Sequence, residues 1–368
     1  PTEEQSLTLT QSIYSYSNWA DFAKAKRERA AGDADFRVVE QDLILNVAEA
    51  YFAALSVYED LNSIQSEVRA VKEYYDFVRA KREDGLVRQT DLLDAQARYL
   101  QAHSRELEIR SNLNDAMQGL REVTGQLPQS LKLLSDNIAL KAPNPDSPEA
   151  WLEKAIQANP ELAGLRERVD VARHEMRSEK GGRYPTLDLT FEKRNRNTQG
   201  TLFGGGSEVE TQEITFELTV PLYSGGEVSS KIREARAGYS KVQEDLDAEL
   251  RAVQRDIYAA YDSILSDMAK VEVLAKSVEA YESGAETKRV AYEAGLASGL
   301  TVLDAERDLF FARTEYAHAR YGYVLSMLRL KRVAGTLSMD DLVELDDQLS
   351  DETYTVAAYS RLPKIELN

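Results

Sequence analysis

The side chains that most often carry catalysis or bind metals are few in this chain and are not grouped. Cysteine is absent, and the three histidines, His103, His174 and His318, do not lie at metal-ligand spacing from one another. Disulfides, a thiol nucleophile and a thiolate zinc site are therefore excluded. The consecutive glycines at 204–206 are not followed by the lysine and hydroxyl residue that a phosphate-binding loop needs. The sequence predicts no enzyme, no cofactor and no structural metal.

The remaining reactive groups are carboxylates, and they outnumber the basic side chains. The chain has 63 Asp and Glu against 45 Lys and Arg, a formal net charge of -18. Such a balance argues against nucleic acid as a partner, because phosphate binding needs a basic surface. Most of these carboxylates are expected on solvated helix faces. Asp94 and Asp304 differ from the rest because they occupy the same place in a repeated pattern.

The sequence contains two copies of one pattern, and the copies are offset by about 210 residues. The copies share a glycine-leucine step, a leucine-aspartate-alanine step and a closing glycine: Gly85-Leu86 and Gly295-Leu296, Leu93-Asp94-Ala95 and Leu303-Asp304-Ala305, Gly125 and Gly335. A register held over roughly 110 residues indicates duplication, since solenoid units are only about 20 to 50 residues long. We expect a first repeat at 1–145, a second repeat at 146–345 and a C-terminal tail at 346–368.

Each copy predicts a long helix, a short break and a second helix. Residues 17–84 contain no proline and one glycine, and apolar residues from Leu43 to Val71 recur every four and three residues in alternation. A mean period of about 3.5 is typical of helices that supercoil around neighbours. The first copy therefore predicts helices at 17–84 and 90–124, and the second at 227–294 and 301–334. A helix of ~67 residues would be roughly 100 Å long, so these helices must pack side by side in a bundle or tube.

Three alternating segments predict strands, one at 6–16 and two at 184–195 and 208–223. The last two follow a short helix at 148–180, interrupted at Asn159-Pro160, and a flexible tip at 200–207 joins them. Strands of about 9 to 11 residues can cross a bilayer in a tilted barrel. Aromatic residues gather at the strand ends and resemble an interfacial girdle: Tyr14, Tyr16, Trp19, Tyr184 and Tyr223.

A half-buried sheet in water is the alternative interpretation of the same alternation. We favour the membrane because no other part of the sequence is left to cover the apolar face of so few strands. The mean hydropathy is -0.46 and no run of ~20 apolar residues exists, so no transmembrane helix is predicted.

The chain resembles the TolC-like outer-membrane efflux and secretion channels. The shared signals are PLYSGG at 221–226, ANPEL at 158–162, YPTL at 184–187 and the two helix breaks at 85–95 and 295–305. The resemblance covers roughly residues 6–345. It implies a mainly α fold with a small β part, in which a long α-helical barrel of coiled-coil hairpins is capped by a transmembrane antiparallel β-barrel shared by a homotrimer. It also implies a short helix and a strand ahead of residue 1.

The same resemblance implies a passive exit duct in the bacterial outer membrane that spans into the periplasm. Its partners would be the lipid bilayer, a periplasmic adaptor and an inner-membrane pump. The duct would belong to a tripartite efflux pump or a type I secretion system and carry drugs, small molecules or proteins. A non-conducting structural coiled coil or adaptor of the periplasm is the alternative. An adaptor would need lipoyl-like and small β-barrel segments, which this sequence does not show.

The resemblance implies a periplasmic gate at the two helix breaks. Asp304 matches a family position where carboxylates ring the narrowest point, and Asp94 is its repeat partner. Asp91 matches a position that helps to hold the closed state, and Tyr292 matches a locking residue. The alternative interpretation is that Asp91 and Asp304 are carboxylates in the first turns of helices. Such a carboxylate stabilises a helix by about 0.3 to 1 kcal/mol through its interaction with the helix dipole.

The partner arginine of the family lock falls on Ala297 in this chain. Arg88 or Arg82 could take its place. In a trimer, three Asp304 carboxylates would face one axis, and hard cations prefer such convergent oxygens. We therefore expect di- or trivalent cations to block conduction at Asp304.

Overall fold

The computed structural model describes residues 2–135, 140–198 and 204–355, which form two compact units. The first unit contains Pro1–Val38 and Pro160–Ala252, and the second contains Val39–Asn159 and Val253–Asn368. Helices α1 (Tyr16–Glu83) and α5 (Glu227–Glu293) have 68 and 67 residues and contribute to both units. The long helices expected at 17–84 and 227–294 are confirmed. Each unit draws on both sequence repeats, so the division into repeats at 145 and 345 stays a prediction.

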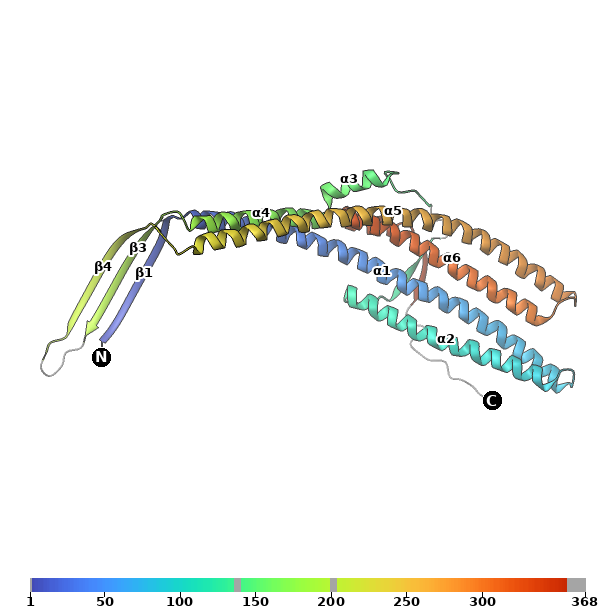
Figure 1. The fold of residues 1–368 in the computed structure, drawn as a ribbon. Coiled ribbons are helices and arrows are strands. Elements are labelled where there is room, and N and C mark those ends of the chain that lie inside the picture. Colours follow the sequence, from blue (N-terminus) through green and yellow to red (C-terminus); the bar gives the residue numbers. More distant parts are fainter. Residues whose placement is uncertain (1, 136–139, 199–203, 356–368) are drawn as a thin grey trace. The chain divides into compact units, whose positions relative to one another are not determined.

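A sheet of three antiparallel strands belongs to the first unit (Figure 1). Its order is β1 (Thr2–Tyr14), β3 (Thr186–Thr198) and β4 (Ser207–Thr219). The register aligns Leu9, Phe191 and Ile214 in one row across the three strands. Leu9 and Ile214 are 66% and 65% exposed, so this apolar face is open. The three expected strands are confirmed, and the expected tip at 200–207 lies partly outside the described residues.

Helix α4 (Pro160–Gly181) joins the first unit through ion pairs with α1. Arg27 Nη1 lies 3.1 Å from a carboxylate oxygen of Glu167, and Arg168 Nη2 lies 2.6 Å from Asp35. The side chains of these residues are 28% to 51% exposed, so each pair contributes only about 0 to 1 kcal/mol. The pairs serve to fix the register of α4 along α1.

The second unit contains two helical hairpins (Figure 1). One joins the later part of α1 to α2 (Gln89–Thr124), and the other joins the later part of α5 to α6 (Gly299–Val333). The breaks contain Gly85 and Gly295, whose φ values of 74° and 73° lie in the left-handed region that favours glycine. Leu61 of α1 and Ile264 of α5 are fully buried, which stabilises the unit by about 1.5 to 3 kcal/mol per side chain.

The expected interruption of the short helix is confirmed, because α3 (Pro148–Ala158) ends before Pro160. The Ser147 hydroxyl accepts a hydrogen bond from the Ala150 backbone N–H at 3.2 Å and so caps α3. At the far end Asn159 is 1% exposed, and its side-chain amide donates to the Val333 carbonyl at 2.8 Å. The break between α3 and α4 is therefore fastened to the end of α6.

Three elements of the second unit were not predicted from the sequence. Strand β2 (Ser130–Leu134) pairs with β5 (Leu349–Thr355), and α7 (Met339–Asp346) precedes β5. The Tyr51 hydroxyl of α1 donates to the Lys132 carbonyl at 2.8 Å, and burial raises the pKa of Tyr51 to about 12. Part of the expected tail at 346–368 is thus a paired strand, and its residues 356–368 lie outside the described range.

In the described ranges, no helix is both long enough and apolar enough to cross a membrane. The same residues contain no cluster of three or more His, Cys, Asp or Glu side chains that could hold a metal ion.

Candidate functional site: the ends of the two hairpins

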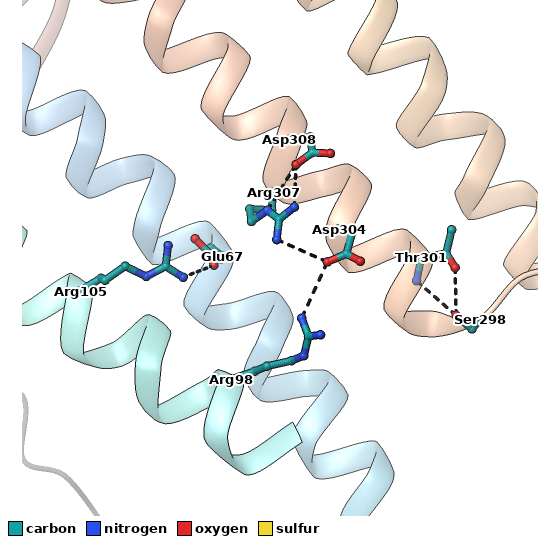
Figure 2. A network of polar contacts seen from close by, with 8 residues as sticks. All are labelled: Glu67, Arg98, Arg105, Ser298, Thr301, Asp304, Arg307 and Asp308. Atoms are coloured by element: carbon teal, nitrogen blue, oxygen red, sulfur yellow. Dashed lines mark hydrogen bonds and ion pairs between the residues drawn. The ribbon is translucent and has the colours of Figure 1, made fainter. Parts of the chain in front are cut away.

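The start of α6 is set by the residue before it. The Ser298 hydroxyl accepts a hydrogen bond from the Thr301 backbone N–H at 3.3 Å and lies 2.9 Å from the Thr301 hydroxyl (Figure 2). Because this cap starts the helix at Gly299, Asp304 lies beyond the first turn, which contains no acidic residue. The first-turn interpretation of Asp304 is therefore wrong.

Asp91 does lie in the first turn of α2. One of its carboxylate oxygens accepts a hydrogen bond from the Arg88 backbone N–H at 3.2 Å. The Arg82 guanidinium donates to the Val87 carbonyl at 3.0 Å, inside the same turn. Asp91 and Arg82 therefore stabilise the turn between α1 and α2. The substitution of Arg82 or Arg88 for the lock arginine stays a prediction.

Asp304 lies between two guanidinium groups from different hairpins (Figure 2). Its Oδ1 is 3.9 Å from Arg98 Nη1 of α2 and 3.5 Å from Arg307 Nη1 of α6. Arg307 also donates to Asp308 at 2.9 Å, and this hydrogen bond raises the pKa of the guanidinium. The Asp304 side chain is 43% exposed, so it is accessible to water and ions.

A second ion pair lies beside this one, inside the hairpin of α1 and α2. Arg105 Nη2 is 2.6 Å from a carboxylate oxygen of Glu67 (Figure 2). A small cavity of about 90 Å³ lies among the charged groups; its walls are Glu67, Val71, Arg98, Gln101, Arg105, Leu300, Leu303, Asp304 and Arg307. The hairpins thus meet here across polar groups and an unfilled space.

Two other expected gate residues lie nearby in different surroundings. Asp94 is exposed, and its carboxylate has no ion pair in the part of the chain that the structure describes. Tyr292 is 40% exposed and lies against Gly299. A Cβ added at Gly299 would lie 3.3 Å from the Tyr74 ring and 3.5 Å from the Tyr292 ring. Tyr74 of α1 therefore reaches the turn of the other hairpin.

The expected aromatic girdle lies where strands of the first unit meet helices. The rings of Tyr14 and Trp19 are 5.3 Å apart in an edge-on contact, and those of Tyr16 and Tyr184 are 4.9 Å apart. Trp19 and Tyr184 are 62% and 48% exposed, and Tyr223 is 90% exposed. Four of the five residues form two pairs at one junction, and their role at a membrane interface stays a prediction.

Sequence reasoning missed Arg98, Arg307 and Tyr74 at the ends of the hairpins. Arg98 follows Asp94 by one helical turn, and this spacing was a usable signal for a charge on the same face. Its contact with Asp304 joins helices of different repeats, which spacing alone does not predict.

These features define a protein of long paired helical hairpins with a small antiparallel sheet, and comparison with known proteins identifies its family. The sequence profile of the outer membrane efflux protein family matches residues 3–126 and 151–336. The chain therefore belongs to the outer membrane efflux protein family.

Similar proteins agree with this assignment. The chain is 31% identical to the outer membrane protein TolC of Escherichia coli strain K12, over 95% of this chain and 73% of that protein. It is 30% identical to the proteases secretion protein PrtF of Dickeya chrysanthemi, over 92% of this chain and 74% of that protein. The fold matches the Campylobacter jejuni CmeC outer membrane channel with a TM-score of 0.72 at 16% identity, over 95% and 81% of the chains.

The family assignment fixes the location and the broad role. The chain is a bacterial outer-membrane protein with a periplasmic extension, and it is an exit duct of efflux or type I secretion. The non-conducting coiled coil and the adaptor are not favoured.

Proposed function

We propose that three copies of this chain form a passive duct and that the sheet of each copy supplies one part of a closed β-barrel. The open sheet of the first unit carries this proposal. Leu7 and Leu9 of β1 and Ile214 and Phe216 of β4 are 65% to 68% exposed, and β1 and β4 are both edge strands. Lipid can cover the apolar face of the sheet. It cannot cover the two edge strands, because their unpaired backbone groups need hydrogen-bond partners that lipid does not supply. Pairing with other copies supplies those partners.

The duct carries out no chemistry. It takes drugs, small molecules or proteins from an inner-membrane pump through a periplasmic adaptor, and the pump selects the cargo. The chain is similar to a protein named for protease secretion, which supports proteins as one class of cargo. The hairpin ends, with Asp304, Asp94, Asp91 and Tyr292, form the periplasmic entrance.

Purified protein in a planar bilayer tests the proposal. We expect extraction from outer membranes to need detergent, a particle mass of about three 41.3 kDa chains and discrete conductance steps. A monomer that dissolves without detergent and never conducts would support the non-conducting coiled coil instead.

A further inference from the structure

The helix ends beside the sheet of the first unit are basic, although the chain as a whole is acidic. Residues 16–26, 172–183 and 227–237 together contain nine Lys and Arg against five Asp and Glu. The whole chain contains 45 against 63, and strands β1, β3 and β4 together contain three against eight. We call the Lys and Arg residues of these three segments the basic band.

Contacts inside the first unit bring the three helix ends together (Figure 1). The Ser17 hydroxyl of α1 donates a hydrogen bond to the Ser178 carbonyl of α4 at 3.0 Å. The Arg183 guanidinium, just after α4, donates to the Ser229 hydroxyl of α5 at 3.1 Å. The basic band therefore belongs to one cluster of helix ends and not to three separate places.

The positive charge of the basic band is not neutralised within the chain. The Glu175 carboxylate pairs with Lys24, and the Glu227 carboxylate pairs with Lys231 at 2.9 Å. Such pairs are neutral, so the excess of basic residues remains. Five members of the band are exposed and form no ion pair in the ranges that the structure describes: Lys26, Arg177, Lys180, Arg233 and Arg236.

The basic band adjoins the aromatic pairs at the strand ends. Tyr14 lies against Trp19, and the rings of Tyr16 and Tyr184 are 4.9 Å apart. Every member of the band is at most about ten residues, or about 15 Å along a helix, from the end of its helix nearest the sheet. An apolar surface, then aromatic rings, then long basic side chains is the order expected from the hydrocarbon of a bilayer through its headgroups into water.

We propose that the basic band binds the headgroups of anionic phospholipids in the leaflet that adjoins the helix ends. The proposal rests on the proposed function, which places the apolar face of the sheet in lipid. Guanidinium groups donate paired hydrogen bonds to phosphate oxygens, and lysine ammonium groups bind phosphate as point charges. Basic side chains next to a membrane are attracted to anionic lipid within about one Debye length of its surface. The bound headgroups fix the depth at which the sheet lies in the bilayer.

Lipid-selective quenching of Trp19 fluorescence tests the proposal. Trp19 is 62% exposed at the junction, whereas Trp151, the other tryptophan, is 4% exposed and contributes a constant background. The purified protein is reconstituted in phosphatidylcholine bilayers that contain increasing fractions of brominated phosphatidylglycerol or, in parallel, of brominated phosphatidylcholine. We expect a binding constant for the anionic lipid about 2- to 5-fold that of the zwitterionic lipid. About 1 M salt should bring this ratio close to one.

A triple variant removes charge from the band without removing an ion pair. Arg177→Gln, Lys180→Gln and Arg236→Gln together should lower the ratio of the two binding constants to about one. The charge-conserving triple variant, Arg177→Lys, Lys180→Arg and Arg236→Lys, should keep the preference for anionic lipid. Retention in this second variant separates the loss of charge from a loss of folding.

The matched control removes the same charge from the second unit. It combines substitutions at three exposed basic residues that also form no ion pair in the described ranges: Arg121→Gln, Lys270→Gln and Lys288→Gln. We expect the control variant to keep the wild-type ratio. An equal fall in the control and in the triple variant of the band would show a general effect of net charge and would overturn the proposal.

The outcomes also distinguish this proposal from the proposed function. Equal quenching of wild-type Trp19 by both lipids would overturn lipid binding by the basic band and leave the β-barrel standing. The band would then face another occupant, such as an acidic protein surface. Absence of quenching by either lipid would show that the sheet does not lie in a bilayer, and it would overturn the β-barrel together with the lipid site.

Discussion

His318 of α6 contacts helix α1 of the other repeat through a hydrogen bond and an ion pair. Its Nε2 lies 3.2 Å from the Ser56 carbonyl oxygen and 3.3 Å from Asp60 Oδ1, both on α1. The hydrogen bond to Asp60 raises the pKa of His318, and Glu315 on its own helix adds to the effect. Protonation therefore strengthens the attachment of α6 to α1.

Replacing His318 with glutamine should remove a pH-dependent part of the stability. Because the folded pKa is raised, the stabilisation is fully present below the unfolded pKa of about 6.5 and is lost as pH rises through the folded pKa. The contact is partly exposed, so the effect should stay below about 1 kcal/mol. Thermal unfolding of wild type and His318→Gln should differ more at about pH 5.5 than at about pH 8.5.

His174 provides a control for which the pH dependence of stability should run in the opposite direction. Desolvation lowers its pKa, with a further lowering by Arg177, so its stabilising effect is present at high pH and lost on acidification. A difference for His318→Gln that follows the same direction as His174→Gln would contradict the assignment of the Asp60 contact.

Asp304 should be the site at which multivalent cations block conduction. In the proposed trimer, three Asp304 carboxylates around one axis would offer the oxygens that hard cations prefer, but each cation would have to displace Arg98 and Arg307. Asp304→Ala should abolish block by di- or trivalent cations in planar bilayers while trimers still assemble. Equal block in wild type and this variant would show that another carboxylate binds the cation, and Asp94→Ala would be examined next.

At the scale of elements, two glycines end equivalent helices but have different surroundings. Gly125 follows α2 and Gly335 lies just beyond α6, with φ values of 74° and 71°. A Cβ at Gly125 would meet nothing within 4 Å, whereas a Cβ at Gly335 would overlap the backbone of Asn159 and Ala158. Gly335 therefore allows α6 to approach the break between α3 and α4.

Alanine substitutions at Gly125 and Gly335 distinguish the free-energy cost of a left-handed conformation from the cost of steric overlap with neighbouring backbone. Gly125→Ala should destabilise by about 1 to 2 kcal/mol, the cost of a left-handed conformation for a residue with a Cβ. Gly335→Ala should lower the free energy of unfolding by about 1 to 3 kcal/mol more than Gly125→Ala does, because the backbone of Asn159 must also shift. Unfolding by denaturant of the two variants measures the difference, and equal losses would show that α6 does not pack tightly there.

The predictable elements are those with a long uniform pattern. The helices from Tyr16 and Glu227, the breaks at Gly85 and Gly295 and the three strands of the sheet follow from periodicity and glycine placement. Strand β2 has five residues and its partner β5 is more than 200 residues away, so no local pattern reveals the pair. The same holds for the aromatic pairs of the girdle and for the contact between Arg98 and Asp304. Both depend on packing between segments that are far apart in the sequence, so no local pattern predicts them.

At the scale of the whole molecule, the acidic composition predicts ion selectivity. Three chains of net charge -18 carry a formal charge of about -54. Carboxylates along a water-filled lumen attract cations and repel anions. Reversal potentials measured across a salt gradient should therefore show cation preference. Anion preference would show that the carboxylates lie outside the tube, and Asp304→Asn should reduce the preference without reversing it.

The pairing of β1 with β3 also constrains how the chain acquires its structure. Thr10 and Thr190 are neighbours in the sheet although 180 residues separate them. Contacts of such high sequence separation form slowly, because a long loop must close before they stabilise anything, whereas the hairpins form from nearer contacts. Strand β1 is made before β3, so its unpaired backbone and exposed leucines must be kept from self-association in the meantime. We therefore expect the chain to need protection from aggregation until β3 is available, and overproduction should yield aggregates seeded by β1 before any helical hairpin misfolds.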